Sequence, residues 1–543
     1  MKKFCGKGVY GAIAIGRVSV FSRQGTNITQ QKAEDPEQEL KRLAAAKALA
    51  SAQLAEIYEK ACSEVGEENA QIFEIHMMML EDEDHSERIE TLIRTEQATA
   101  EYAVLTAGNE FSEMFASMDD DYMQARAADV KDISNRLISC LTGSSETGDA
   151  GSDMHILCAD DLAPSETVSL DKSLVVAFVT AFGSSNSHTA ILARNMDIPA
   201  VIGAGEEFLS AVKDGDMLIV DGHTGDLILD PDTETEQFYR ARQEEDYCRA
   251  KSLSELKGRP NITKDGREIR IYANIGGPDG VDAALENDAG GIGLFRSEFL
   301  YLERSDCPTE EQQFDAYKDV LTRMEGRQVI IRTLDIGADK QIDYFGLKHE
   351  DNPALGLRAV RLSLTRPELF RTQLRALYRA SVYGQLGIMF PMITSVSEVE
   401  KCLAACEEVK RELSAEGIAY SDSVEIGIMV ETPAAAVISD LLAQIVDFFS
   451  IGTNDLTQYT LACDRQDPAL EAFADPHHEA VLRLIELTAK NAHAHDTWVG
   501  ICGELAADTS LTQTFLRMGI DELSVSAPFI LPLREAVRSS TAY

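Results

Sequence analysis

The stretch Val424-Glu-Ile-Gly-Ile-Met-Val430, followed directly by Glu431, decides the fold of the C-terminal half, because it is an apolar run of strand length that ends in a charged residue. Eight runs of strand length follow residue 263, and stretches with helical periodicity separate most of them. The runs span residues 269–275, 290–295, 329–334, 386–392, 424–430, 446–451, 497–502 and 521–525. Eight such units in about 280 residues predict a (β/α)8 barrel over residues 263–543.

Polar residues occupy the C-terminal ends of these runs, where the active sites of such barrels lie. They are Arg296, Arg332, Glu431, Asn454, Asp455 and Cys502. A single arginine or carboxylate after a strand is most often a cap or one partner of a salt bridge. Six polar residues at five strand ends predict a common site at the mouth of the barrel.

Arginines on several loops suit a small, multiply charged anion, because the planar guanidinium binds carboxylate or phosphate at two points. Arg358 and Arg465 could join the arginines at the strand ends. In a site rich in arginine, Glu431 and Asp455 make sense as ligands of Mg²⁺, which prefers oxygen and keeps positions open for substrate. The alternative is that both carboxylates pair with arginine and hold no metal.

Cys502 opens the sequence Cys-Gly-Glu504 at the mouth of the predicted barrel. A thiol in this place could deliver a proton to a carbanion or an enolate. The alternative is a structural role, because cysteine is also a common small buried residue.

The N-terminal half combines a helical block with strand-like runs on either side of it. Residues 35–141 carry leucine, alanine, isoleucine and methionine at three- and four-residue steps, which predicts helix almost throughout. The strand-like runs span residues 12–20, 156–158, 174–179 and 217–220. We therefore expect the helical block to be inserted into a small α/β domain whose first strand is N-terminal.

The predicted architecture is multidomain. An α/β domain comprises residues 1–22 and 145–230, an α-helical subdomain spans residues 23–144, a helical linker spans residues 231–262, and the barrel follows.

A single histidine, His188, lies in the stretch Gly183-Ser-Ser-Asn-Ser-His188-Thr-Ala-Ile-Leu-Ala-Arg194, between a loop of small residues and an apolar run with helical spacing. A histidine at a helix start, where backbone N–H groups face outward, is well placed to hold a phosphoryl group. The alternative is an ordinary cap or surface residue, and this stretch alone favours neither.

The composition narrows the class of partner. With 50 Lys+Arg against 91 Asp+Glu, the net charge of −41 disfavours nucleic acid and anionic membranes, and it favours basic partners or cations. The ten cysteines are scattered, which indicates neither a zinc site nor a disulfide framework and fits a reduced, cytoplasmic setting. We find no signal peptide and no apolar run of about 18 residues that would predict a membrane span.

Six ordered motifs lie between residues 187 and 504. They are Ser187-His-Thr-Ala-Ile-Leu-Ala-Arg194, Gly291-Ile-Gly-Leu-Phe-Arg296-Ser-Glu298, Arg332-Thr-Leu-Asp-Ile-Gly-Ala-Asp-Lys340, Gly427-Ile-Met-Val-Glu431-Thr-Pro433, Phe449-Ser-Ile-Gly-Thr-Asn454-Asp455-Leu-Thr-Gln458 and Gly500-Ile-Cys502-Gly-Glu504. Together they resemble enzyme I of the bacterial phosphoenolpyruvate:sugar phosphotransferase system.

By this resemblance, His188 in the α/β domain would accept the phosphoryl group of phosphoenolpyruvate, and Thr167 would orient its ring. Glu431 and Asp455 would hold Mg²⁺, and Cys502 would protonate enolpyruvate to pyruvate. The residues that would grip the substrate are Arg296, Arg332, Arg358 and Arg465, with Lys340 and Asn454 as helpers. The chemistry agrees, since phosphoryl transfer depends on in-line positioning and dispersal of charge.

The resemblance also assigns a docking surface for the small phosphocarrier HPr to the helical subdomain, where methionines lie beside a dense acidic cluster. Its expected contact residues are Glu67, Glu68, His76, Met78, Met79, Asp82, Glu83 and Asp84. A methionine stripe is otherwise usually core, and a charge run is usually a solvated face. Homodimerisation through the barrel is implied by the resemblance alone.

Several positions depart from the family pattern, namely Ser184, Asn186, Ala338 and Gln466. Ser184 could stiffen the loop that carries His188, because glycine tolerates backbone angles that serine does not. Two other functions remain open. A dikinase-type phosphohistidine enzyme would need an ATP-binding domain, for which no nucleotide loop precedes His188, and a regulatory paralogue would bind carrier or phosphoenolpyruvate without catalysis.

Overall fold

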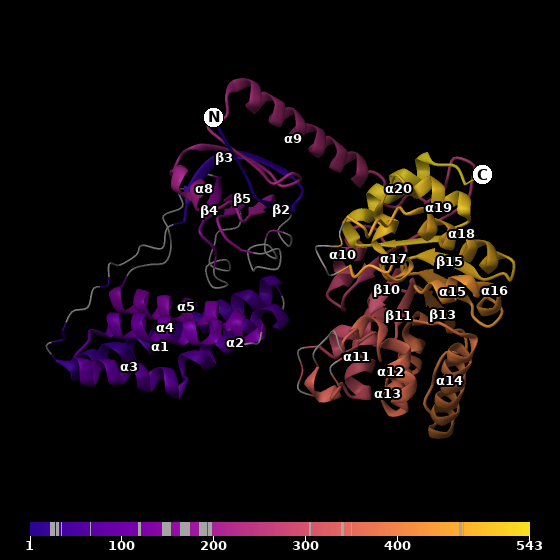
Figure 1. The fold of residues 1–543 in the computed structure, drawn as a ribbon, viewed down its shortest axis with the longest axis horizontal. Coiled ribbons are helices and arrows are strands. Elements are labelled where there is room, and N and C mark those ends of the chain that lie inside the picture. The colour runs from indigo at the N-terminus through magenta and orange to yellow at the C-terminus, as the bar shows by residue number, and fades with distance from the viewer. Residues whose placement is uncertain are drawn as a thin grey trace. The chain divides into compact units, whose positions relative to one another are not determined.

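The computed structural model describes residues 1–542 except for 22–27, 29–31, 34, 66, 118–120, 144–153, 163–173, 184–192, 194–197, 303, 305, 338–341, 349, 466–469 and 471. Two compact units make up the chain, Met1–Arg249 and Ala250–Tyr543 (Figure 1). The boundary between them falls inside one helix, α9 (Thr233–Ser254). The finer domain limits given above stay predictions.

The C-terminal unit contains a closed barrel of eight strands, and each neighbouring pair of strands is parallel. The strands are β9 (Arg270–Ile275), β10 (Ile292–Arg296), β11 (Gln328–Arg332), β12 (Gln385–Phe390), β13 (Glu425–Val430), β14 (Phe448–Ile451), β15 (Trp498–Ile501) and β16 (Glu522–Val525). This architecture confirms the predicted (β/α)8 barrel. The third and fourth strands end two residues before the predicted limits, where the chain enters the loops of the barrel mouth.

Helices follow the barrel strands along the chain and cover the outside of the barrel. They are α10 (Gly280–Glu286), α11 (Glu310–Arg323), α12 (Ala359–Thr365), α13 (Pro367–Ala380), α14 (Val396–Glu416), α15 (Pro433–Val437), α16 (Ser439–Leu442), α17 (Thr453–Leu461), α18 (Glu479–His493), α19 (Thr512–Met518) and α20 (Ile530–Ser539). Local sequence sets their ends. A capping box of Ser395 and Glu398 begins α14, and Gly417 with φ of 73° ends it.

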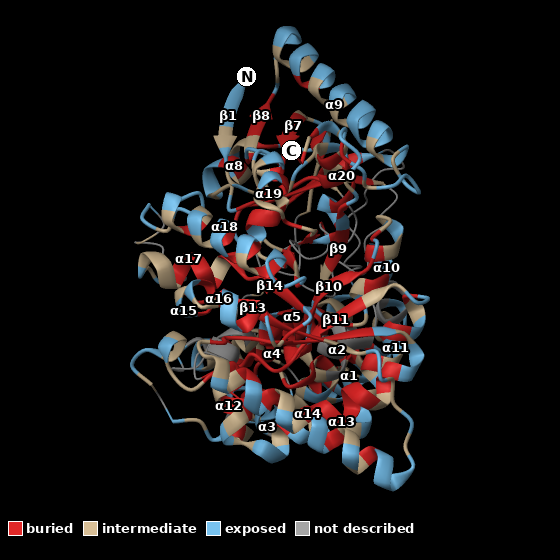
Figure 2. Cartoon of the chain, turned by 90° about the vertical axis from the view of Figure 1, so that its right-hand side faces the viewer, coloured by how far each residue is buried: buried red, intermediate tan, exposed pale blue. Residues whose placement is uncertain are grey.

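Burial explains why the barrel strands read as apolar runs. In Figure 2 the labelled barrel strands β9, β10, β11, β13 and β14 are mostly red, whereas the helices carry blue on their outer faces. Alternate strand residues such as Ile428 and Val430 belong to the large core between barrel and helices. Met429, between them, packs inside the barrel with Leu294, Ile330 and other residues. A strand covered on both faces needs apolar residues at nearly every position.

One carboxyl group interrupts the apolar interior of the barrel. Glu522, the first residue of β16, is fully buried, and neither carboxyl oxygen has a hydrogen-bond partner in the described part of the chain. Two glycines make room for it, because a Cβ atom would lie 1.8 Å from Oε2 at Gly500 and 2.3 Å from Oε1 at Gly293. Burial raises the pKa of Glu522 to about 8, although Arg270 lowers it. The carboxyl is therefore protonated at neutral pH.

The N-terminal unit contains a mixed sheet of eight strands in the order β1-β8-β7-β3-β4-β5-β6-β2. The strands are β1 (Lys2–Cys5), β2 (Lys7–Tyr10), β3 (Ile13–Val20), β4 (His155–Ala159), β5 (Val175–Thr180), β6 (Ala200–Ile202), β7 (Met217–Asp221) and β8 (Asp226–Leu229), with the helix α8 (Glu206–Ala211) after β6. Four of these strands match the predicted runs. The short strands β1, β2, β6 and β8 were not predicted, since three or four residues carry little periodicity.

In the part of the chain that the structure describes, five helices lie between β3 and β4, which confirms a helical block inserted into an α/β domain. They are α1 (Pro36–Val65), α2 (Glu67–Leu80), α3 (Glu83–Glu96), α4 (Ala100–Ala116) and α5 (Asp121–Thr142). The helices bury a core of their own, in which Leu54, Phe73 and Leu137 are almost fully covered. The helical block thus has the separate core expected of a subdomain.

The unpaired Glu522 predicts a specific pH dependence of stability. Its pKa is raised in the folded chain, so unfolding releases a proton between pH 4.5 and about 8, and the native state weakens as the pH rises through this window. Glu522→Gln removes this effect. We expect the variant to gain on the order of a few kcal/mol in the free energy of unfolding relative to wild type between pH 5 and pH 8, with no further gain above.

Urea unfolding of both proteins across this range measures the difference. Other groups with shifted pKa values are common to both and cancel. A difference that is constant with pH would show that the Glu522 carboxyl is not held in its protonated form.

Candidate active site

A chain of alternating charges lies at the mouth of the barrel, and all its members are buried except Arg465 at its exposed end. Asp335 joins two arginines, with its Oδ2 3.0 Å from Arg332 Nη1 and its Oδ1 3.0 Å from Arg358 Nη2. Arg358 Nη1 lies 3.6 Å from Oδ1 of Asp455, whose Oδ2 is 3.3 Å from Arg465 Nη1. The structure thus brings together four of the predicted site residues through one that was not predicted, Asp335.

Short loops after the strands place these side chains. Arg332 is the last residue of β11, and Glu298 lies in a 3₁₀ turn directly after β10. One oxygen of Glu298 accepts a hydrogen bond from Arg332 Nη2 and another from the backbone N–H of Asp335, both at 2.9 Å. Glu298 therefore holds the Arg332 guanidinium in place. It also holds the loop that carries Asp335, the second carboxylate partner of Arg332.

Carboxylates keep the buried arginines charged. Burial works against the charge of Arg332, but Glu298 and Asp335 more than offset it and raise the pKa of the guanidinium above its usual value. Asp335 and Asp455 have the same effect on the pKa of Arg358. These are ready-made cationic groups for a phosphate or a carboxylate.

Glu431 and Asp455 form the candidate metal pair. Glu431 follows β13, is buried, and accepts a hydrogen bond from the backbone N–H of Met392 at 2.6 Å. Burial raises its pKa to about 8, and the charges of Asp455 and Asp335 add to the rise. Asp455, in the first turn of α17, is 7% exposed, and its Oδ1 has no hydrogen-bond partner among the described residues.

This donor set fits a divalent cation. A cation near both oxygen donors would relieve the repulsion that disfavours the ionised form of Glu431. The described residues contain no cluster of three or more aspartate, glutamate, histidine or cysteine side chains suited to a metal. Two carboxylates with open positions for substrate oxygens match the way proteins bind Mg²⁺.

Cys502 lies directly after β15, with its side chain in the interior cluster of the barrel. Burial raises the pKa of its thiol to about 12, although Ser450 lowers it. At neutral pH the residue is therefore a thiol. A buried thiol suits proton donation better than nucleophilic attack, which needs the thiolate.

The other predicted residues differ in how far the structure describes them. Arg296 ends β10 and is exposed. Oδ1 of Asn454 accepts a hydrogen bond from the backbone N–H of Glu504 at 3.0 Å, so it ties two strand ends together. His188, Thr167 and Lys340 lie outside the described residues, as do the departures Ser184, Asn186, Ala338 and Gln466.

Sequence reasoning missed Glu298 and Asp335 as site residues. Both stand in quoted motifs, Arg296-Ser-Glu298 and Arg332-Thr-Leu-Asp335. The signal that could have found them is the same one that identified the arginines, because each is a charged residue just beyond a strand end. A cluster of buried arginines needs carboxylates to hold its charge.

The predicted carrier-docking residues lie on α2, on α3 and in the turn between them. Met78 is 65% exposed, and Asp82 and Asp84 are exposed, while Asp82 also caps α3 by accepting a hydrogen bond from the backbone N–H of His85. Met79 is half-buried against the helical core. The side chains of Glu67, Glu68 and Glu83 lie outside the described residues.

The expectation for His76 needs correction. Its side chain is fully buried, with Nε2 3.3 Å from Asp129 and Nδ1 3.6 Å from Asp132, both on α5. A buried ring cannot contact a docked partner. The resemblance placed His76 on the docking surface with Met78, but on α2 the histidine faces α5 and the methionine is exposed. His76 therefore joins α2 to α5 beneath the surface.

Comparison with known proteins gives three matches to family models and a set of close relatives. The models describe the PEP-utilising enzymes: the N-terminal domain matches residues 5–126, the mobile domain 151–225 and the PEP-binding domain 250–542. Phosphoenolpyruvate-protein phosphotransferase of Bacillus subtilis is 42% identical over 99% of this chain and 94% of its own length. The protein of the same name from Geobacillus stearothermophilus is 43% identical over 97% of this chain and 91% of its own.

The buried charge chain predicts a large stability effect at one position. Asp335→Asn should lower the free energy of unfolding by about 2–4 kcal/mol, because it leaves two buried guanidinium groups short of a carboxylate. Asp319→Asn is the matched control. It removes an exposed partner of Arg323 and should cost less than about 1 kcal/mol. Chemical unfolding measures both, and equal effects would mean that Asp335 does not hold the arginines.

Proposed function

Because the chain belongs to the phosphoenolpyruvate-protein phosphotransferases, the enzyme I family of the phosphotransferase system, we propose that it moves the phosphoryl group of phosphoenolpyruvate first to His188 and then to the carrier HPr. The assignment of residues rests on the charge chain at the barrel mouth. In it, three arginines lie beside the carboxylates of Asp335 and Asp455. Substrate binds there, His188 comes from the N-terminal unit, and pyruvate is released as phosphoryl transfer begins the uptake of sugar.

The arginines bind the substrate. Arg332 and Arg358 are already charged, buried and fixed by Asp335, so little side-chain freedom is lost when an anion binds. Arg296 is exposed at the end of β10, where it can turn toward the phosphate or carboxylate. Arg465 and Asn454 lie at the same mouth, and Lys340, which lies outside the described residues, follows β11 in the sequence.

Glu431 and Asp455 hold Mg²⁺, which when bound disperses charge on the phosphoryl group and on the substrate carboxylate. Their high local negative charge supports this role. Thr167 orients the ring of His188, which attacks phosphorus in line with the leaving enolate. Cys502, held as a thiol by burial, gives its proton to C3 of enolpyruvate and completes pyruvate.

The acidic face of α2 and α3 receives the carrier. The exposed Met78 and Asp84 supply an apolar anchor within a field of negative charge, which suits a small basic partner. We further propose a homodimer through the barrel and a cytoplasmic location. Among the described helices, none is long and apolar enough to span a membrane.

Labelled phosphoenolpyruvate tests the first transfer. Incubation with Mg²⁺ and without nucleotide should attach one acid-labile phosphoryl group per chain, at His188, because phosphohistidine hydrolyses in acid. His188→Ala should carry no label, and Glu431→Gln should lower the rate by ~100-fold or more through loss of the metal. Mass spectrometry of the intact chain and scintillation counting measure the label.

The outcomes separate the possible activities. Label that needs ATP would indicate a dikinase-type enzyme, and absence of label would indicate a binding protein without catalysis. Either result would contradict the proposal.

A charge reversal on the acidic face tests the second transfer. Asp84→Lys should raise KM for HPr by ~10-fold, which corresponds to roughly 1.4 kcal/mol, and should leave phosphorylation by phosphoenolpyruvate unchanged. Glu400→Lys, an exposed reversal on α14 of the barrel unit, is the control for net charge. Transfer to purified HPr measures KM for both variants. Equal changes of KM in the two charge reversals would show that the docking surface is misplaced.

A further inference from the structure

Inside the barrel, the carboxyl of Glu522 lies one layer of side chains closer to the starts of the strands than Cys502 does. Gly500 pairs with Glu522 across β15 and β16, and the Glu522 Oε2 atom occupies the space of a Gly500 side chain. Gly500 precedes Cys502 by two residues, so both face the interior, about 7 Å apart along the strand. The two groups interact electrostatically, since Glu522 contributes to the raised pKa of the Cys502 thiol.

Hydroxyl groups line the space around these two residues. The buried Ser450 on β14 interacts with the Cys502 side chain and lowers the pKa of its thiol. The Ser524 hydroxyl lies in the same layer as the Glu522 carboxyl, because both would meet a Cβ atom at Gly293. Ser524 Oγ donates to Asn274 Oδ1 at 2.6 Å, and Asn274 Nδ2 donates to the Cys502 carbonyl at 2.9 Å.

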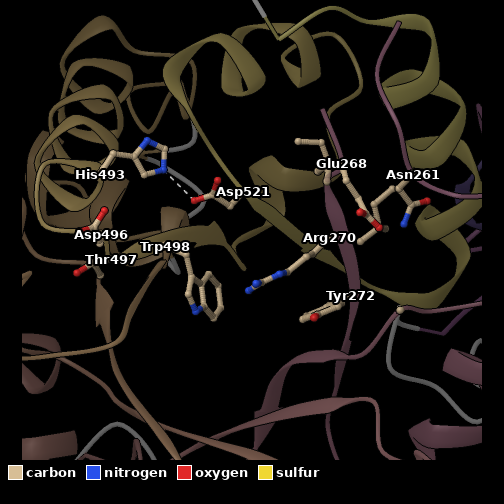
Figure 3. Close-up of a pocket in the computed structure, with 12 residues that line it drawn as sticks. Asn261, Glu268, Arg270, Tyr272, His493, Asp496, Thr497, Trp498 and Asp521 are labelled. Carbon is tan, nitrogen blue, oxygen red and sulfur yellow. Dashed lines mark hydrogen bonds and ion pairs between the residues drawn. The ribbon is translucent and has the colours of Figure 1, made fainter. Parts of the chain in front are cut away.

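A pocket of about 760 Å³ opens at the other end of the barrel, at the starts of the strands. Figure 3 shows Arg270 reaching toward Trp498, and the guanidinium carbon lies 4.8 Å from the ring centroid. Arg270 is exposed and lowers the pKa of Glu522. Tyr272 also lines the pocket and interacts with the Glu522 charge. The carboxyl thus lies between this pocket and the buried thiol.

We propose that Glu522 is the internal proton donor that reloads Cys502 after each turnover, so that the barrel conducts a proton from its amino-terminal pocket to the active-site thiol. This role rests on the proposed function, in which Cys502 protonates enolpyruvate. It makes Glu522 a further residue of the reaction, acting through the thiol without touching the substrate.

The proton balance is simple. Cys502 gives its S–H proton to C3 of the enolate, and a C–H bond forms as the thiol becomes a thiolate. The O–H proton of Glu522 then moves to the sulfur through an intervening hydroxyl or water, which restores the thiol and leaves a carboxylate. Solvent protonates that carboxylate at the Arg270 end. One solvent proton enters pyruvate in each cycle.

The geometry suits this task better than a structural one. A structural buried carboxyl is normally paired or hydrogen-bonded, whereas neither oxygen of Glu522 has a hydrogen-bond partner in the described part of the chain, and two glycines clear space for them. The groups that face it are Arg270 and Tyr272 on β9, Cys502 after β15, and Asp521 beside it in sequence. With its pKa at about 8, the carboxyl is protonated at neutral pH and can still ionise.

Exchange of the methyl protons of pyruvate in D₂O tests the relay, because it requires proton traffic through Cys502 and does not require His188. With Mg²⁺ present, we expect wild-type protein to exchange these protons at a rate that rises with pH to about 8 and then levels off. Glu522→Gln should exchange ~10-fold slower at pH 8, without a plateau there. Proton NMR of pyruvate follows the exchange.

Two controls make the result specific. Glu268→Gln removes an exposed carboxyl of the same pocket and should exchange like wild type, and Cys502→Ala should not exchange. Phosphorylation of His188 by labelled phosphoenolpyruvate in a single turnover should be normal in Glu522→Gln, since that step needs no proton. Its unfolding curve shows that the variant is folded.

Equal exchange in Glu522→Gln and wild type would overturn the relay. Absence of exchange in wild type would overturn it as well. Both results leave the label on His188 intact, whereas failure of the proposed function would remove the label itself.

Discussion

The charge chain that runs from the buried Glu298 to the exposed Arg465 is the constraint on which the barrel mouth depends. Arginines that must stay charged without water need carboxylates, and each carboxylate in turn must be held by a backbone N–H or a second arginine. Asp335 meets both demands, because it bridges two guanidinium groups while its own N–H is fixed by Glu298. The loops after β10 and β11 therefore cannot move independently, and the mouth is preorganised for an anion.

The same logic links the metal pair to the substrate groups. Asp455 lies within reach of Arg358 and Arg465 and also raises the pKa of Glu431. Its charge is thus shared between arginines and the candidate cation. A substrate with several negative charges could bind the arginines and the cation at the same time. Phosphoenolpyruvate, with its phosphate and its carboxylate, has such charges. Deeper in the barrel, Glu522 is buried without a charged partner of this kind. Its carboxyl, which has no hydrogen-bond partner among the described residues, stays protonated instead.

Much of the barrel could be predicted from the sequence, because strands buried on both faces must be apolar and barrel chemistry must follow their ends. That reasoning located Arg332, Glu431 and Cys502 correctly at strand ends. It missed Asp335, whose importance lies in pairing with side chains from other loops. The family resemblance, by contrast, placed His76 on the docking surface, although its side chain is buried. Helical spacing shows which residues share a face, but not which neighbour covers that face, and here α5 covers it.

The central claim is that fixed, forked arginines at the barrel mouth bind the phosphate and carboxylate of phosphoenolpyruvate. Arg332→Lys keeps the positive charge near Glu298 and Asp335 but loses the planar fork, so the fold should persist while substrate binding fails. Calorimetric titration of phosphoenolpyruvate with Mg²⁺ into both proteins measures this directly. We expect a loss of affinity of ~30-fold or more, roughly 2 kcal/mol, in the variant. Equal affinities in two folded proteins would contradict it.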